Sequence, residues 1–322
     1  MLLLDKPRGL GSNAALQAAR RLMGALKAGH TGTLDPLASG LLPIAFGEAT
    51  KLAGLTSGAD KRYTARILLG VATDSGDAEG RIIARCPVGV DAAAIEAALA
   101  RLRGEILQLP PMHSALKRDG RPLYELARRG IEVERPARRC RIDELRLTGR
   151  EGDFLDLAIS CSKGTYIRSL AIDIGTSLGC GAHVTALRRT AVGQFDVSQA
   201  IGLDALEALT PFGRMQRLLA PEALAAGLAR IDLEGRDAAR FLHGQAVEGE
   251  FPASGEPLRV HMDGRFRGLG RVRPDGRLQP LRLLGCAGAD EGCGIRLSRT
   301  PQGGYNARLP KARESADGDS DG

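Results

Sequence analysis

Hydrophobic positions in the first hundred residues follow helix spacing in some segments and strand spacing in others. In residues 12–26, the apolar side chains that share one side of a helix are Leu16, Ala19, Met23 and Leu26. Ser12 precedes them and is expected to cap the N-terminus of that helix. Residues 62–69 alternate with a period of two, as in a half-buried strand, and Asp91 is expected to cap a second helix. Both types of element are therefore predicted within one domain.

The two spacings meet again in the middle of the chain. Residues 155–161 alternate as a strand, and residues 167–178 carry apolar side chains at the spacing of a helix. Tyr166 and Arg168 fall at the junction between them, where side chains are held on a rigid base. Because strands and helices mix without strict alternation, the pattern predicts an α+β fold rather than a doubly wound sheet.

Turn residues mark the organisation of the C-terminal part. Asp263-Gly264 and Asp275-Gly276 each separate short apolar runs, which predicts two successive β-hairpins. A stretch rich in Pro and Ala, residues 210–229, is expected to be helical and to lead into this small β domain. Beyond Pro310 no apolar residue is larger than Ala, which predicts disorder. The predicted parts are a catalytic domain over residues 1–229, a small β domain over residues 230–285 and a tail over residues 286–322.

The chain is basic. A formal charge of +7 and a pI near 9.3 favour a polyanionic partner without identifying one. Basic residues concentrate between positions 117 and 141, so this segment is either a phosphate-binding face or a solvated surface. The residues expected to contact an RNA backbone are Lys117, Arg128, Arg129, Arg138 and Arg139. Aromatic residues form only 3% of the chain, so extended base-stacking platforms are not expected.

Composition also bears on compartment and cofactors. No apolar stretch approaches the roughly 20 residues that span a bilayer, and the first residues resemble neither a signal nor a transit peptide. A cytoplasmic protein without a membrane partner is therefore expected. The six cysteines form no Cys-x-x-Cys pair and are expected to be reduced. The five histidines show no regular spacing with cysteines or carboxylates, so neither a metal nor another cofactor is expected.

One acidic residue, Asp35, stands in the most constrained stretch of the chain. Residues 29–40 read Gly-His-Thr-Gly-Thr-Leu-Asp-Pro-Leu-Ala-Ser-Gly, and the glycines permit backbone angles that are closed to other residues. Pro36 directs Asp35 towards an extended conformation. The carboxylate is therefore held by backbone geometry. This indicates either a rigid loop that delivers one side chain to a site or an aspartate that caps a turn.

Four further blocks stand in order around this loop. They are Leu3-Leu4-Asp5-Lys6-Pro7, Asp60-Lys61-Arg62-Tyr63, Cys161-Ser162-Lys163-Gly164-Thr165-Tyr166-Ile167-Arg168 and Leu187-Arg188-Arg189. Together with the Asp35 loop they resemble the motifs of the TruB family of tRNA pseudouridine-55 synthases, over about residues 1–200. The resemblance implies a mixed sheet flanked by helices and a small RNA-binding C-terminal domain of the PUA type. It also implies that the substrate is uridine 55 in the T-arm of tRNA, which is isomerised to pseudouridine. The protein is expected to be a monomer.

Uridine isomerisation needs a single carboxylate and no redox step. The bond from ribose C1′ to uracil N1 breaks, the uracil turns, and C5 bonds to C1′ before it loses its proton. An ionised Asp35 begins this either as a nucleophile at C1′ or as a base at C2′, and the sequence leaves both routes open. A closed pocket would raise the pKa of Asp35 unless a cation compensated, and Arg168 is the candidate cation. The resemblance implies the same pairing.

The resemblance assigns further roles around an extruded uridine. Tyr63 is expected to stack on the uracil, and His30 is expected to pack against the disrupted RNA stack. The other residues expected to contact or shape the pocket are Tyr166, Leu187, Lys6 and Asp77. Ordinary structural roles are the alternatives: a strand aromatic for Tyr63, a loop hydrogen bond for His30, core packing for Leu187 and a turn for Asp77.

Two other functions are compatible with parts of the sequence. A tRNA-binding or tRNA-folding protein with little or no catalysis would need the basic segment, but it would not need Asp35, Tyr63 and Arg168 together. An aspartyl-phosphate enzyme is suggested by Thr31-Gly32-Thr33, but in such enzymes the aspartate precedes its Thr-Gly-Thr and further carboxylates hold Mg²⁺. Here that order is reversed. Isomerisation is therefore the predicted function.

Overall fold

The structure is a computed structural model that describes residues 1–114, 116–118, 120–131, 133–252 and 255–285. The predicted tail, with Cys286 and Cys293, lies outside the described residues. None of the described helices is both long and apolar enough to cross a membrane.

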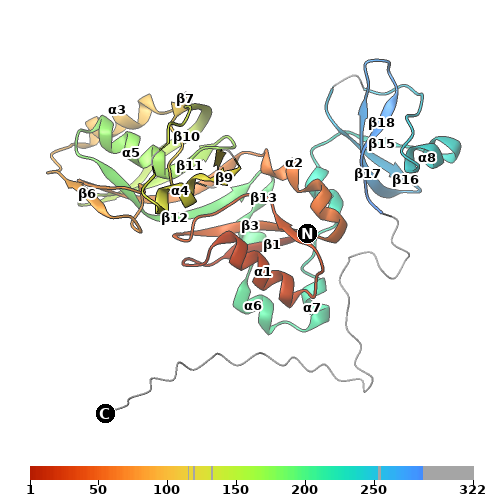
Figure 1. Cartoon of the computed structure of the whole chain (residues 1–322), viewed down its shortest axis with the longest axis horizontal. Helices are drawn as coiled ribbons and strands as arrows, with labels where there is room; N and C mark the ends of the chain where they lie inside the picture. Colours follow the sequence, from red (N-terminus) through yellow and green to blue (C-terminus); the bar gives the residue numbers. More distant parts are fainter. Residues whose placement is uncertain (115, 119, 132, 253–254, 286–322) are drawn as a thin grey trace, which may run out of the picture.

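A ten-stranded mixed sheet organises the larger part of the molecule (Figure 1). From one edge to the other its strands are β14 (Ile201–Gly202), β1 (Leu2–Lys6), β3 (Ala38–Phe46), β12 (Ala182–Val192), β4 (Lys61–Leu69), β11 (Phe154–Cys161), β10 (Arg138–Glu151) and β7 (Gly104–Gln108). Two short strands extend it, β2 (Ala28–His30) beside β3 and β13 (Phe195–Asp196) beside β12. The β1–β14 and β3–β12 pairs are parallel and the others are antiparallel, so the predicted α+β class is confirmed.

Helices cover the sheet at both of its ends. Figure 1 shows α1 (Ser12–Leu22), α6 (Leu203–Ala208) and α7 (Pro211–Met215) beside β1 and β3, and α3 (Ala92–Arg101) and α5 (Ile167–Ser177) towards β7 and β10. The shorter helical segments are α2 (Ala53–Ser57), α4 (Leu123–Arg128), η1 (Gly47–Leu52), η2 (Val197–Gln199) and η3 (Pro221–Ala225). Two small hairpins are formed by β5 (Val71–Thr73) with β6 (Ile82–Arg85), and by β8 (Lys117–Arg118) with β9 (Arg121–Pro122).

Most of the predicted elements are confirmed. In β4 and β11 the alternate residues are buried, and in α5 the apolar side faces the core. Asp91 caps α3, because its carboxylate accepts a hydrogen bond from the backbone of Ala94 at 2.7 Å. The helical stretch predicted over residues 210–229 is divided into the short segments α7 and η3.

The prediction for α1 was wrong at both ends. Gly11 is the N-cap, and the hydroxyl of Ser12 instead bonds the backbone of Leu34, accepting from its N–H at 2.7 Å and donating to its carbonyl at 2.8 Å. The helix ends at Leu22, because Gly24 adopts a left-handed conformation (φ 59°) that turns the chain towards β2. Leu26 is 69% exposed as a result. Ser12 thus joins α1 to the loop that carries Asp35.

The small C-terminal sheet matches the two predicted hairpins. Its strands are β15 (Arg230–Asp232), β16 (Leu258–Met262), β17 (Arg265–Val272) and β18 (Leu278–Leu283), accompanied by α8 (Gly235–Leu242). Asp263 and Gly264 both have positive φ, as the tight turn between β16 and β17 requires. Leu269 of this sheet belongs to the same buried cluster as Leu41 of β3 and Leu52 of η1. The two sheets therefore share an apolar contact.

Candidate active site

The loop between β2 and β3 delivers Asp35 from a rigid base. Leu34 and Leu37 on either side of it are buried, so the chain is anchored while the carboxylate projects. The backbone N–H of Ala38 donates to the carbonyl of Asp35 at 3.0 Å and closes a turn. Gly40 has a φ of 103°, and a Cβ there would collide with the carbonyl oxygen of Arg189 on the neighbouring strand. The prediction of glycine-specific backbone angles thus holds at Gly40, whereas Gly29 and Gly32 do not adopt positive φ.

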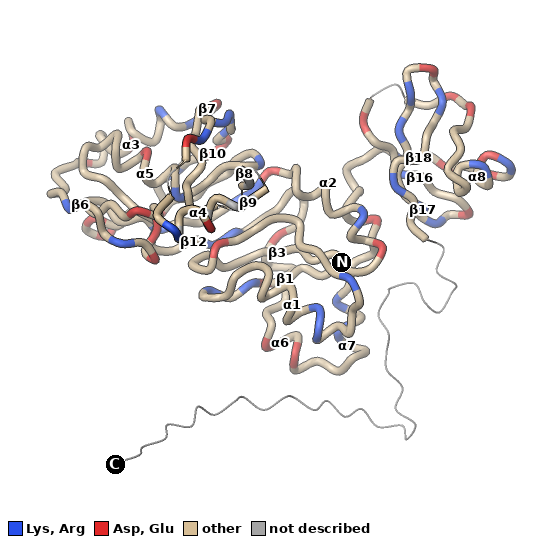
Figure 2. The backbone as a smooth tube through the Cα atoms, viewed as in Figure 1, with Lys and Arg blue, Asp and Glu red and all other residues tan. Residues whose placement is uncertain are grey.

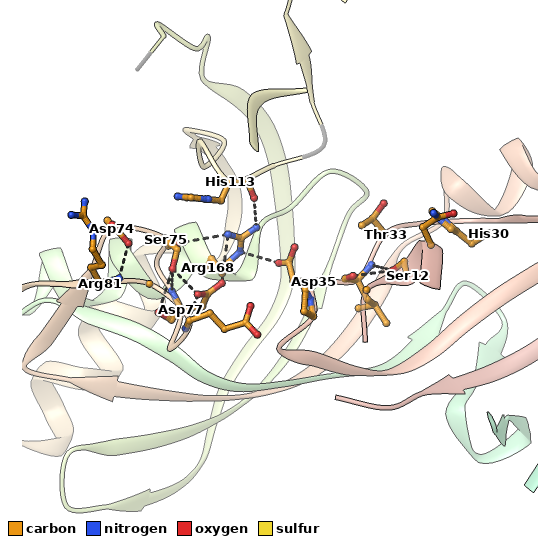
Figure 3. A pocket seen from close by; sticks show the side chains of 16 residues that line it. Ser12, His30, Thr33, Asp35, Asp74, Ser75, Asp77, Arg81, His113 and Arg168 are labelled. Carbon is orange, nitrogen blue, oxygen red and sulfur yellow. Dashed lines mark hydrogen bonds and ion pairs between the residues drawn. The ribbon is translucent and has the colours of Figure 1, made fainter. Parts of the chain in front are cut away.

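Arg168 lies at the centre of the polar groups around Asp35. Its Nε is 2.9 Å from Oδ2 of Asp35, and its Nη1 is 3.6 Å from Oδ2 of Asp77. Two backbone carbonyls hold the other side of the guanidinium, since Nη1 donates to Ser75 at 3.3 Å and Nη2 donates to His113 at 2.6 Å. Figure 3 shows these contacts converging on one side chain. The predicted proximity of Arg168 to Asp35 is therefore confirmed.

The charge state of Asp35 depends on this arrangement. Burial raises the pKa of Asp35, Arg168 lowers it, and the neighbouring Asp77 raises it. Asp77 is itself buried and held in a turn, because Ser75 Oγ donates to its Oδ1 at 2.6 Å and the Glu79 N–H donates to it at 3.1 Å. Asp77 is thus both a turn carboxylate and a partner of Arg168.

A small cavity of about 120 Å³ opens beside Asp35. Tyr63 of β4, Tyr166 at the start of α5 and Leu187 of β12 line it together. Burial raises the pKa of Tyr63 and of Tyr166, so both hydroxyls stay protonated near neutral pH. The volume is about that of four water molecules, which suits one nucleobase and not a whole nucleotide.

The same side of the sheet carries a larger cleft of about 730 Å³, which also contains Asp35, Asp77 and Arg168. His30 lines this cleft, and Figure 3 places it on the far side of Asp35 from Arg168. Its Nδ1 is buried and has no hydrogen-bond partner among the described residues. A backbone hydrogen bond within His30 itself opposes the effect of burial on its pKa, so the alternative of a loop hydrogen bond stays open. Burial lowers the pKa of His30.

Lys6 lies beneath the site rather than in its opening. Its side chain is fully buried, and Nζ donates to the carbonyls of Pro7 at 2.9 Å and Leu10 at 2.5 Å. Burial lowers the pKa of Lys6 to about 8, although the nearby Asp35 acts in the opposite direction. This placement agrees with a residue that shapes the wall of the site.

The predicted RNA-backbone residues lie on neighbouring elements. Arg138 and Arg139 are exposed at the start of β10, and Arg129 is exposed just after α4. Lys117 is the first residue of β8, and Arg128 is the last residue of α4. Figure 2 also shows Lys and Arg along the small sheet, with acidic residues at several of its turns. Contact of these residues with RNA stays a prediction.

Sequence reasoning missed two buried side chains that organise the site. Gln108 at the end of β7 holds the backbone of Tyr166 from both directions, accepting from its N–H at 2.7 Å and donating to its carbonyl at 3.1 Å. Arg189 bonds the Asp35 loop from behind. For Arg189 a signal existed, because two adjacent arginines on one strand must point to opposite faces. No comparable signal marks Gln108.

No three His, Cys, Asp or Glu side chains come together as a metal site in the part of the chain that the structure describes.

Two solved structures are similar to this chain in fold. It resembles the crystal structure of an archaeal box H/ACA sRNP Nop10-Cbf5 complex, with a TM-score of 0.67 and 22% identity over 88% of this chain and 85% of the other. It also resembles a Cbf5-Nop10-Gar1 complex, with a TM-score of 0.64 and 26% identity over 84% of this chain and 77% of the other. The first likeness, at that identity, concerns the fold alone.

Curated relatives are far closer in sequence. The tRNA pseudouridine synthase B of Aromatoleum aromaticum is 55% identical over 88% of this chain and 92% of its own length. That of Azoarcus sp. is 53% identical over 88% of this chain and 94% of its own length. The model of the TruB family pseudouridylate synthase N-terminal domain matches residues 20–167. Two TruB C-terminal domain models match residues 168–222 and 227–284. The chain therefore belongs to the TruB family of pseudouridylate synthases.

Proposed function

We propose that this protein isomerises uridine 55 in the TΨC loop of tRNA to pseudouridine. The observation that carries the proposal is the ion pair of Asp35 with Arg168 at the edge of a cavity that fits one nucleobase. The tRNA substrate and the isomerisation accord with the names of the curated relatives. The position within tRNA follows from the resemblance of the motifs.

Asp35 begins the reaction as an ionised carboxylate. Either it attacks ribose C1′ while the bond from C1′ to uracil N1 breaks, or it takes the proton from C2′. In both routes the uracil leaves as an anion, stays bound and turns. Its C5 then bonds to C1′, and in the first route this displaces Asp35 from C1′, whereas in the second route the abstracted proton returns to C2′. C5 finally loses its proton, and N1 gains one. Arg168 supports either route, because its charge opposes the effect of burial on the pKa of Asp35.

A uridine stacked in an RNA loop cannot reach this carboxylate, so it is extruded at a cost of a few kcal/mol. Tyr63 then stacks on the uracil, and Tyr166 and Leu187 complete the pocket around it, in keeping with their place in the lining. His30 faces the cleft, where it packs against the RNA stack that the uridine has left. Asp77 contacts the nucleotide, and Lys6 supports the wall.

Binding of tRNA rests on the basic surface. Arg129, Arg138 and Arg139 meet phosphates, and Lys117 and Arg128 are assigned to the same face from the sequence. The small sheet over residues 230–285 supplies further phosphate contacts as an RNA-binding domain of the PUA type, and the catalytic domain comprises residues 1–229. The protein acts on the T-arm as a monomer in the cytoplasm and needs no cofactor.

The test is incubation of the purified protein with an unmodified tRNA transcript, without added nucleotide or metal, followed by site-resolved detection of pseudouridine. Product at uridine 55 is expected with the wild-type protein, and none with Asp35→Asn. Asp156→Asn is the matched control, because Asp156 is a surface carboxylate that lies 3.8 Å from Arg66 and away from the small cavity.

The affinity for tRNA separates the two candidate functions. Asp35→Asn should bind tRNA within about tenfold of the wild type, because binding rests on phosphate and shape contacts. Loss of binding together with activity would make Asp35 a structural residue. Tight binding by the wild type without any pseudouridine would favour the tRNA-binding or tRNA-folding alternative.

A further inference from the structure

Arg189 places a charge in the interior directly behind the Asp35 loop. Its side chain is 2% exposed, and it is among the largest fully buried side chains of the described chain. It lies on β12, paired with Gly40 of β3 on one side and with Tyr63 of β4 on the other. One residue thus stands between the loop that carries the carboxylate and the strand that carries the aromatic ring.

Three hydrogen bonds of Arg189 go to backbone carbonyls on both sides of Asp35. Nη2 donates to Gly32 at 3.3 Å, Nη1 donates to Thr33 at 3.3 Å, and Nε donates to Leu41 at 2.8 Å. A planar fork of this kind fixes the relative position of the groups it bonds, whereas a single point charge would not. Arg189 therefore holds the two ends of the loop together.

The same guanidinium also reaches the aromatic side of the site. Tyr63 is the cross-strand neighbour of Arg189, and its pKa is raised by burial and lowered by Arg189. Burial lowers the pKa of Arg189, and Tyr63 is the group that opposes this. Tyr63 and the loop of Asp35 thus both neighbour one buried side chain.

Burial of a cation against carbonyls and a phenol is costly for stability. Apolar residues of similar volume often replace buried charges without loss of stability, so such a charge is weak support for the fold itself. The neighbouring Arg188 shows the ordinary arrangement: its side chain is 41% exposed and bonds both oxygens of Asp5, at 3.0 and 2.7 Å. Arg188 thus pairs with a carboxylate at the surface, whereas Arg189 is buried among neutral groups. This contrast indicates that Arg189 has a role in the site rather than in the stability of the fold.

We infer that Arg189 is a positioning residue that fixes Asp35 relative to Tyr63, because it bonds the loop of one and is the cross-strand neighbour of the other. This inference rests on the proposed function, since it concerns how those two residues are held. Displacement of a reacting group by about 1 Å can cost about 100-fold in rate. A residue that only stabilised the fold would leave the rate per folded molecule unchanged.

Two substitutions separate these roles. Arg189→Met keeps much of the side-chain volume without the fork, and Arg189→Lys keeps the charge with one donor group. Single-turnover isomerisation of an unmodified tRNA transcript is measured with each, together with the tRNA dissociation constant and the thermal unfolding midpoint. Arg188→Gln, on the opposite face of the same strand, is the control.

The rate should fall about 100-fold in Arg189→Met and about tenfold or more in Arg189→Lys. The tRNA dissociation constant should stay within about threefold of the wild type, because phosphate contacts lie elsewhere. Arg188→Gln should keep the wild-type rate. A wild-type rate in either Arg189 variant overturns the inference. If Arg189→Met does not fold, the rate of Arg189→Lys decides alone.

A double substitution tests the link to Tyr63. If Arg189 acts partly through Tyr63, the losses in Arg189→Lys and Tyr63→Phe should combine to less than their product in the double variant. Strictly multiplicative losses would show that Arg189 does not act through Tyr63.

The Asp35→Asn variant distinguishes failure of this inference from failure of the proposed function. If that variant is active, the proposed function fails. If it is inactive while the Arg189 variants keep the wild-type rate, only the positioning role fails.

Discussion

Replacement of Arg168 by Met should make isomerisation strongly dependent on pH. In the wild type, Arg168 lowers the pKa of Asp35 against burial and against Asp77, which both raise it. The Met side chain removes the cation and leaves the two carboxylates together. The pKa of Asp35 then rises, so a larger fraction of the protein carries a protonated, inactive Asp35 at low pH. At high pH the carboxylate is ionised in both proteins. The variant should therefore recover part of its activity as the pH is raised.

The structure sets the size of this effect. Two unit charges in contact interact by about 1 kcal/mol in bulk water and about 4 kcal/mol at an effective dielectric constant near 20. Nε of Arg168 lies 2.9 Å from Oδ2 of Asp35, and these side chains are 5% and 36% exposed, so solvent screens the pair in part. We therefore expect about 2 kcal/mol, which is about 30-fold in an equilibrium constant. Relative to the wild type, the rate should fall about 30-fold more at the acid end of the profile than at the alkaline end.

The assay is the single-turnover rate on an unmodified tRNA transcript, measured from acid to alkaline pH at saturating protein. Arg168→Lys is the companion variant, since it keeps the charge but loses the planar fork. It should be slower at every pH, with a smaller difference between the two ends. A loss in Arg168→Met that is the same at every pH would refute the electrostatic role of Arg168. An unchanged rate would refute any role of the pair in the reaction.

Three further outcomes are expected. Asp91→Ala should lower the free energy of unfolding by about 1 kcal/mol, through loss of the helix cap, with no change in rate; urea titration measures it, and an unchanged midpoint would contradict the cap. Arg265→Gln with Arg271→Gln, both exposed on the small sheet, should reduce the slope of log affinity against log salt by about 1 to 2 while the saturating rate survives. Glu222→Ala should destabilise the protein by about 1 to 3 kcal/mol, because Glu222 accepts a hydrogen bond at 3.0 Å from the buried His261 of the small sheet. Calorimetry measures this, and an unaltered unfolding transition would show that the bond between Glu222 and His261 does not stabilise the protein.

Local patterns in the sequence predicted the elements that depend on local chemistry. The alternation in β4 and β11, the cap at Asp91 and the turn at Asp263-Gly264 were all found. The proximity of Arg168 to Asp35 was also predicted, because a buried carboxylate that must stay ionised needs a cation. These predictions share a property: each follows from neighbours in sequence or from a charge that requires a partner.

The features that were missed depend on contacts between distant segments. Ser12 has the composition of a helix cap, but a tertiary bond to Leu34 competes for its hydroxyl and prevails. Gln108 meets Tyr166 across 58 positions of sequence, and nothing at position 108 itself indicates it. A polar side chain in a strand is normally assigned to the solvent side. Only the assembled sheet shows which polar residues turn inward.

Two buried arginines act on the Asp35 loop in different ways. They differ in whether they contact the carboxylate or the backbone of the loop. Arg168 bonds the carboxylate of Asp35 directly and is the charge that lowers its pKa most, whereas Arg189 bonds backbone carbonyls of the loop. Arg189 instead lowers the pKa of Lys6, which itself favours the ionised form of Asp35. Loss of Arg189 should therefore move the acid limb of the pH profile much less than loss of Arg168. A rate loss that is constant across pH in Arg189→Met, beside one concentrated at low pH in Arg168→Met, would separate geometry from charge within one site.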